Sequence, residues 1–208
     1  MKYLIITCSF ISLLTVAQEI YKGESIFYEK LKDYKENKVS YKCEVTICLR
    51  STTDIFKNFG NDYRVVPKKA SKKQYLREEC LLMQINDTLY INGFKLNQLQ
   101  AYTKILFKGE YLFFQAAATK NDIENINFAL SLAGAPIVAG VIESIYALKR
   151  YNFILDTKNG KFRILTINDL INIVSKYPKL VELINSNPNW ENPNEIVKIL
   201  TLYEKLNN

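Results

Sequence analysis

The sequence of 208 residues contains no histidine. Histidine is the side chain that titrates nearest neutral pH, and it is the commonest protein ligand of transition metals. Its absence excludes Ser-His-Asp and Cys-His hydrolases, and also zinc sites built on imidazole. Carboxylate-pair chemistry needs no imidazole, but the acids stand singly or beside lysines, as in Glu29-Lys30 and Lys32-Asp33. We therefore expect a noncatalytic protein with no cofactor and no metal; an enzyme that uses carboxylates or tyrosines is an alternative.

The sequence also lacks low-complexity tracts, so nothing in it predicts a disordered arm. Hydrophobic residues make up 48% of the chain and aromatic residues 12%, and the mean hydropathy is close to zero. This composition is typical of a packed globular protein. Residues 18–208 are long enough for one domain with a sizeable core, and we expect a single domain there.

The first seventeen residues have the order of an export signal. Lys2 gives a short basic start, an apolar run extends from Tyr3 to Leu14, and the segment ends on the small residue Ala17. The apolar run is shorter than the roughly 18 to 20 residues of a membrane span. We predict a signal peptide over residues 1–17, cut before Gln18, and a mature protein that is exported to the periplasm or outside the cell.

Three cysteines follow the predicted cleavage site: Cys43, Cys48 and Cys80. If residues 42–50 form a strand, Cys43 and Cys48 lie on opposite faces about 16 Å apart and cannot form a disulfide with each other. Cys43 shares its face with Val45 and is expected to be a buried apolar thiol. Cys48 with Cys80 is then the one disulfide that the pattern allows, but we expect three reduced thiols, with that disulfide as the alternative.

The net charge of +7 is thinly spread except in residues 64–77, which carry six positive charges and no acid. Such a cluster attracts phosphate-rich lipid headgroups or another polyanion. A solvated basic connection is the favoured interpretation, because lysine-rich surface segments are common, and contact with a polyanion is the alternative. The candidate contacts with a polyanion are Arg64, Lys68, Lys69, Lys72, Lys73 and Arg77.

Apolar and polar residues alternate along several short segments, which predicts β-strands. Single strands are expected at 41–50 and 63–66. Three hairpins are expected, with turns at Asn86-Asp87-Thr88, Lys108-Gly109 and Lys158-Asn159-Gly160. Their paired strands are 79–85 with 89–96, 102–107 with 110–117, and 151–156 with 161–165. Residues 18–37 show weak helical spacing, and a helix and an irregular lead-in both stay open there.

The C-terminal third has helical spacing, which predicts three amphipathic helices over residues 167–177, 180–184 and 196–206, the last capped by Asn194. Residues 126–142 form a chargeless segment between the second and third hairpins. As a helix this segment is about 26 Å long, shorter than a hydrocarbon core of roughly 30 Å. We expect a buried, kinked helix or helical hairpin there, with membrane association or a self-assembly surface as alternatives.

Together these patterns predict an α+β fold that combines antiparallel β-hairpins, one central apolar helix and C-terminal amphipathic helices. Several stretches of the chain stand out together in this order: Asp54-Ile55-Phe56, Gly60 to Arg64, Asn86 to Asn92, Lys108 to Phe114, the apolar segment, Lys149-Arg150-Tyr151, Ile154 to Asp156, and Asn159-Gly160-Lys161 leading to Leu165-Thr166. In these stretches the chain resembles a family of small exported bacterial proteins without an established activity. The resemblance implies an exported bacterial protein and supplies no catalytic residues. Family members have glycine-dense repeats in the apolar segment, whereas this chain has Pro136 and fewer glycines.

The sequence favours an exported, noncatalytic protein that binds a partner protein or a component of the cell envelope. The alternative is a membrane-associated protein that uses residues 126–142, with Lys149 and Arg150 contacting lipid headgroups. A membrane surface is therefore among the candidate partners, and nucleic acid is not expected.

Overall fold

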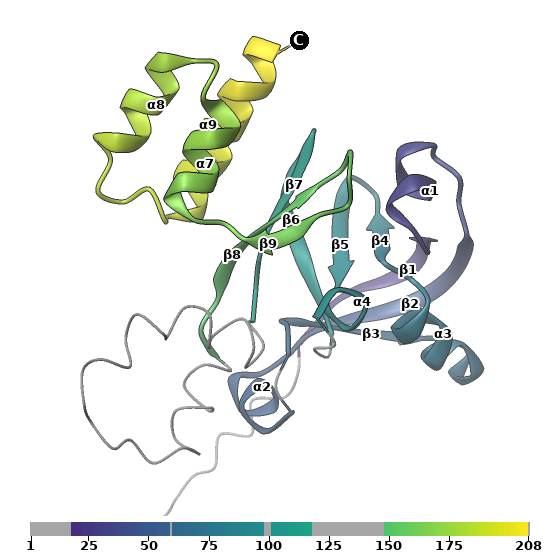
Figure 1. Ribbon diagram of the computed structural model, residues 1–208. Helices are drawn as coiled ribbons and strands as arrows, with labels where there is room; N and C mark the ends of the chain where they lie inside the picture. The colour runs from purple at the N-terminus through teal and green to yellow at the C-terminus, as the bar shows by residue number, and fades with distance from the viewer. Residues whose placement is uncertain (1–17, 59, 98–100, 118–147, 208) are drawn as a thin grey trace, which may run out of the picture.

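The computed structural model describes residues 18–58, 60–97, 101–117 and 148–207 (Figure 1). These residues form a nine-stranded antiparallel sheet and seven α-helices, so the predicted α+β class is confirmed, with the sheet as its main component. The predicted signal peptide at 1–17 and the apolar segment at 126–142 lie outside the described residues.

The secondary-structure elements follow one another in three groups along the chain. The first group is β1 (Gln18–Tyr28), α1 (Leu31–Lys35), β2 (Tyr41–Leu49), α2 (Thr52–Asn58), β3 (Tyr63–Pro67), the 3-10 helix η1 (Ala70–Lys72) and α3 (Lys73–Glu78). The second is β4 (Leu82–Ile85), β5 (Thr88–Asn92), α4 (Gly93–Asn97), β6 (Tyr102–Lys108) and β7 (Tyr111–Ala116). The third is β8 (Tyr151–Asp156), β9 (Phe162–Ile164), α7 (Ile167–Val174), α8 (Pro178–Asn185) and α9 (Pro193–Asn207).

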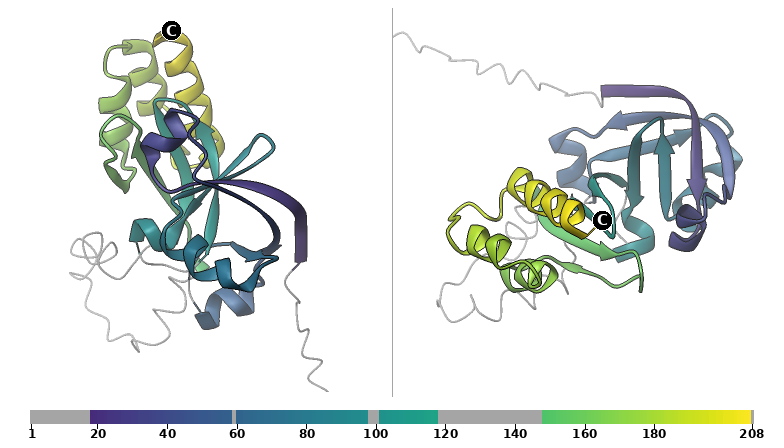
Figure 2. Two further views of the ribbon diagram at one scale, coloured as in Figure 1. Left: turned by 90° about the vertical axis from the view of Figure 1, so that its right-hand side faces the viewer. Right: turned by 90° about the horizontal axis from the view of Figure 1, so that it is seen from above.

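The sheet curls back on itself at one end. Its strand order is β3-β2-β1-β4-β5-β6-β7-β8-β9, and β3 also pairs with β6 through Tyr63 and Tyr102. The six strands from β3 to β6 in this order therefore surround a closed interior, and β6 also pairs with β7, which leads on to β8 and β9 (Figure 2). The seam between β3 and β6 brings the basic segment next to β6, which is distant in the sequence.

The expected strand segments lie in this sheet with shifted limits. The strand expected at 89–96 ends at Asn92, because Asn92 Oδ1 accepts a hydrogen bond from the Phe94 backbone N–H and the chain turns into α4. The strand expected at 79–85 begins only at Leu82, after α3. β1 received no assignment from the sequence, because most of its first half is exposed on both faces and shows no apolar alternation.

Three apolar clusters form the core of the part of the chain that the structure describes. Inside the closed strands, Phe27, Ile47 and Met83 are fully buried. A second cluster lies between the two parts of the sheet and includes the stacked rings of Phe114 and Phe153. The third joins α7, α8 and α9 to β7 and β8. The molecule thus has one continuous sheet with apolar side chains packed against it from several sides.

The three C-terminal helices pack together beside β7 and β8 (Figures 1 and 2). Thr166 begins α7 with a capping box that it shares with Asp169. The predicted cap of the last helix at Asn194 is wrong: α9 begins at Pro193, and Asn192 Oδ1 accepts from the Asn194 backbone N–H at 2.9 Å. Proline has no backbone N–H, so it is well suited to the first helical position, where that group would have no partner within the helix. With Pro193 at this position, the capping residue is Asn192, two residues before the predicted Asn194.

Candidate functional site

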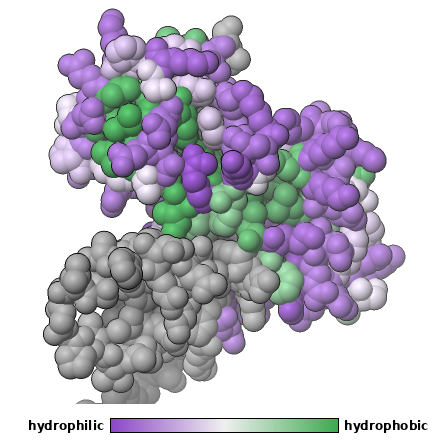
Figure 3. Space-filling model, viewed as in Figure 1, coloured by the Kyte–Doolittle hydropathy of each residue, from purple (hydrophilic) through white to green (hydrophobic). Residues whose placement is uncertain are grey.

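The basic segment 64–77 forms β3, η1 and α3, so its six cations point into different surroundings. Hydrophilic side chains cover the side of the molecule that carries these elements (Figure 3). Arg64 on β3 and Lys73 and Arg77 on α3 line one cavity. Three of the six candidate residues are therefore brought together by the fold.

The other three cations lie elsewhere. Lys68 forms an ion pair with Glu44, and Lys68 and Lys69 border a second hollow beside Tyr41. The Lys72 Nζ lies 4.8 Å from the centre of the Tyr41 ring, which is cation–π distance. The segment is therefore not one continuous cationic face.

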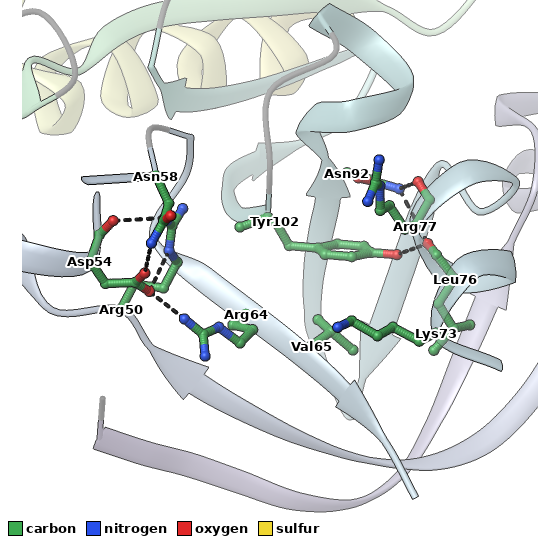
Figure 4. Close-up of a pocket in the computed structure, with 11 residues that line it drawn as sticks. Arg50, Asp54, Asn58, Arg64, Val65, Lys73, Leu76, Arg77, Asn92 and Tyr102 are labelled. Atoms are coloured by element: carbon green, nitrogen blue, oxygen red, sulfur yellow. Dashed lines mark hydrogen bonds and ion pairs between the residues drawn. The ribbon is translucent and has the colours of Figure 1, made fainter. Parts of the chain in front are cut away.

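The cavity lies at the β3–β6 seam, flanked by α2 and α3, and has a volume of about 340 Å³ (Figure 4). Such a volume is within the range of small-molecule sites. Four cations, one carboxylate and a mixture of amide and apolar groups form its described lining. These residues are Arg50, Arg64, Lys73 and Arg77; Asp54; Asn58 and Asn92; and Val65, Leu76, Ala101 and Tyr102.

Asp54 joins two arginines on one wall of the cavity. Its Oδ2 accepts from Arg50 Nε at 2.9 Å and from Arg64 Nη2 at 2.5 Å. The Arg50 side chain is only 3% exposed and also donates to the Asn61 carbonyl oxygen, whereas the Arg64 side chain is 51% exposed. Asn58 Nδ2 donates to the other carboxylate oxygen of Asp54. Arg50 is thus fixed in the protein, while Arg64 reaches the same carboxylate from solvent.

These contacts set the charge state of Asp54. Burial raises the pKa of its carboxyl, but hydrogen bonds from Arg50 and Asn58, together with the charges of Arg50 and Arg64, outweigh burial and lower the pKa to about 2. Asp54 is therefore an anion at neutral pH, and it neutralises one of the four cavity cations.

The opposite wall is held by buried polar contacts. Tyr102 OH donates to the Leu76 carbonyl oxygen at 2.6 Å, and Asn92 Nδ2 donates to the carbonyl oxygens of Arg77 at 2.8 Å and Cys80 at 2.7 Å. Burial raises the pKa of Tyr102 well above its usual value, so its hydroxyl keeps its proton. These bonds attach α3 to β5 and β6 and fix the backbone from which Lys73 and Arg77 extend.

Lys73 and Arg77 complete the cationic lining. In Figure 4 Lys73 extends across Val65 towards the Arg64 side of the cavity. The Arg77 guanidinium lies 4.6 Å from the centre of the Phe94 ring. Within the described ranges, neither side chain has a carboxylate within ion-pair distance. Sequence patterning identified these two cations and Arg64; it missed Arg50 and Asp54, whose separation of four residues was their only signal.

The described cysteines Cys43, Cys48 and Cys80 are free thiols in the structure, and the alternative of a Cys48–Cys80 disulfide is not seen there. Cys80 is buried inside the closed strands with Cys43 packed against the same cluster, whereas Cys48 lies on the opposite face of β2. Cys80 lies within the strand expected at 79–85, but it precedes β4, so strand alternation does not set the direction of its side chain. Burial raises the pKa of the Cys80 thiol to about 12.

The two cations expected at lipid headgroups have protein contacts. The Lys149 Nζ lies 4.8 Å from the centre of the Tyr151 ring, and Arg150 Nη2 donates to Asp62 Oδ1 at 2.6 Å. None of the described helices has the length and apolar character to span a membrane. In the same part of the chain, no group of three or more Cys, Asp or Glu side chains is arranged to hold a metal ion.

Comparison with known protein families identifies one match. Residues 26–207, well over half of the chain, match a family described as "Family of unknown function (DUF6563)". The chain belongs to DUF6563. The expected membership of a family of unknown function is confirmed, and DUF6563 assigns no activity to the cavity residues. No curated protein and no solved structure matches the chain.

Proposed function

We propose that this member of DUF6563 is an exported, noncatalytic binding protein whose cavity at the β3–β6 seam takes an anionic group of a cell-envelope component or partner protein. The observation that carries the proposal is the convergence of Arg64, Lys73 and Arg77 on one cavity. Cations gathered around a concave site raise the local concentration of anions and orient them by charge-assisted hydrogen bonds.

The chain's charge distribution supports a defined site rather than a diffuse attraction. Lys68 is paired with Glu44, and Lys72 lies over the Tyr41 ring, so both are engaged away from the cavity. The positive side chains at the cavity stand above a rigid wall, because Asn92 and Tyr102 hold α3 in place. A preorganised site binds with a smaller ordering cost than flexible surface lysines do.

Isothermal titration calorimetry with inorganic pyrophosphate tests the proposal. We expect saturable binding near one equivalent, weakened about tenfold or more by Lys73→Gln combined with Arg77→Gln, since each charge-assisted contact contributes roughly 1.5–3 kcal/mol. The control is Lys68→Gln combined with Lys69→Gln, which removes the same two positive charges outside the cavity. Equal weakening by this control variant would place the binding on the general positive surface and contradict the proposal.

A further inference from the structure

The cavity has more positive charge than its own carboxylate neutralises. Four cations and one carboxylate leave a formal excess of three positive charges among the described lining residues. A carboxylate ligand supplies one negative charge, whereas a phosphomonoester supplies about 1.5 to 2 at neutral pH and three acceptor oxygens. The charge and the number of donors therefore fit a phosphomonoester better than a carboxylate.

Arg64 is able to move away from Asp54 without leaving the Asp54 carboxylate unpaired. Arg50 keeps Asp54 neutralised, because its Nε donates to Oδ2 at 2.9 Å and its Nη2 donates to the Asp54 carbonyl oxygen at 3.2 Å. The Arg64 side chain is half-exposed, so it stays in contact with water when it moves away from Asp54. An incoming dianion thus competes with Asp54 for Arg64, whose planar fork matches two phosphate oxygens.

The uncharged lining indicates what the phosphate is attached to. Val65, Leu76 and the Tyr102 ring border the same cavity as the cations. A volume of about 340 Å³ is larger than a lone phosphate needs and is within the range of pockets that hold small organic molecules. The ligand therefore has an organic body that packs on these side chains.

We infer that the cavity binds a phosphomonoester group carried on a small organic body, and that Arg64 turns from Asp54 to the phosphate when the ligand enters. The inference rests on the proposed function and names the ligand class of that site. Lys73 and Arg77 hold the remaining phosphate oxygens, and Val65 and Tyr102 contact the organic body.

The experiment compares phenyl phosphate, inorganic phosphate and benzoate by calorimetry on the purified protein. We expect phenyl phosphate to bind about tenfold or more tightly than either of the other two, since inorganic phosphate lacks the ring and benzoate lacks the second charge. Arg64→Gln should weaken phenyl phosphate by about tenfold and Arg64→Lys by less, with Lys69→Gln as the matched control. An unchanged melting temperature of the Arg64 variants shows that they fold.

The outcomes separate this inference from the proposed function. If pyrophosphate binds through Lys73 and Arg77 but benzoate equals phenyl phosphate, or Arg64→Gln has no effect, this inference is wrong and the anion site stands. If no anion binds at the cavity, the proposed function fails as well. Flotation with phosphatidylcholine vesicles that contain phosphatidic acid identifies the source: displaceable vesicle binding indicates a lipid headgroup, and phenyl phosphate binding without it indicates a soluble phosphomonoester. Either result supports the phosphomonoester class.

Discussion

At the scale of single residues, Asp54 is the group on which the cavity wall depends. It receives hydrogen bonds from Arg50, Arg64 and Asn58, and Arg50 is almost fully buried. A buried guanidinium without its carboxylate is costly, because its desolvation is no longer compensated. Asp54 therefore has a structural role and also sets the net charge that a ligand meets.

The low pKa of Asp54 predicts a pH dependence of stability. A carboxyl whose pKa is lower in the folded protein, about 2 against 3.8, stabilises the fold above the unfolded value, and this contribution is lost as pH falls from about 4 towards 2. We expect Asp54→Asn to destabilise the protein at pH 7 by about 3 kcal/mol, since Arg50 loses its partner. Urea denaturation at pH 7 and at pH 2.5 measures the difference.

The difference in the free energy of unfolding between the original protein and the Asp54→Asn variant should be smaller at pH 2.5 than at pH 7. The control Asp87→Asn makes the same chemical change at an exposed turn and should alter stability by less than about 0.5 kcal/mol at either pH. An equal difference in the free energy of unfolding at pH 7 and at pH 2.5 would show that the charge of Asp54 does not contribute to stability.

The sequence pattern predicted some of the residues that line the cavity. It identified Arg64, Lys73 and Arg77, because they stand in a run of cations with no acid between them. The sequence pattern did not identify Asp54 and Tyr102, since each lies at the cavity only because β3 pairs with β6 and α2 folds against that seam. A contact between residues far apart in the sequence leaves no local pattern.

At the scale of elements, Asn92 joins α3 to β5. It is buried, and its Nδ2 donates to backbone carbonyl oxygens at the end of α3 and in the following turn, while its Oδ1 accepts from the Phe94 N–H. Carbonyl groups at a helix C-terminus have no partner within the helix. Asn92 supplies that partner and so fixes the position of Arg77.

We expect Asn92→Ala to lower the free energy of unfolding by about 2 to 3 kcal/mol, because several buried backbone carbonyls lose their donor at once. Urea denaturation monitored by the single tryptophan measures this loss. Asn185→Ala, at an exposed position near the end of α8, should change the same quantity by less than about 0.5 kcal/mol. A loss below about 1 kcal/mol for Asn92→Ala would mean that water replaces its hydrogen bonds.

The elements that the sequence predicted best are those with one buried face. Alternation identified β2, whose Val45 and Ile47 face the core, and helical spacing identified α9 through Ile196 and Ile199. The sequence pattern did not predict β1, because its residues from Gln18 to Glu24 are not buried on either face of the sheet. It is a strand because it pairs along β2, a backbone interaction that side-chain patterns do not record.

At the scale of the whole molecule, the curled sheet brings the residues of the cavity together. The export of the protein is a separate prediction that can be tested on the full chain. Expression of the full chain in a bacterium that processes signal peptides should give an exported protein whose N-terminus is Gln18. Cell fractionation followed by N-terminal sequencing measures this result. Ile11→Arg should retain the protein in the cytoplasm, since a charge interrupts the apolar run, whereas Ile11→Leu should be exported normally. Export of Ile11→Arg, or an uncut N-terminus, would contradict the signal peptide.

The amino-acid sequence was enough to predict the α+β class, most of the strand positions, the C-terminal helices and the cationic character of residues 64–77, because these depend on the local periodicity and charge of neighbouring residues. The tertiary structure alone decided which cations share a cavity, that Asp54 links Arg50 to Arg64, and that Cys43, not Cys48, lies with Cys80. These outcomes follow from the closure of β3 on β6 and from the packing of α3 on β5, which depend on the energies of contacts between distant residues.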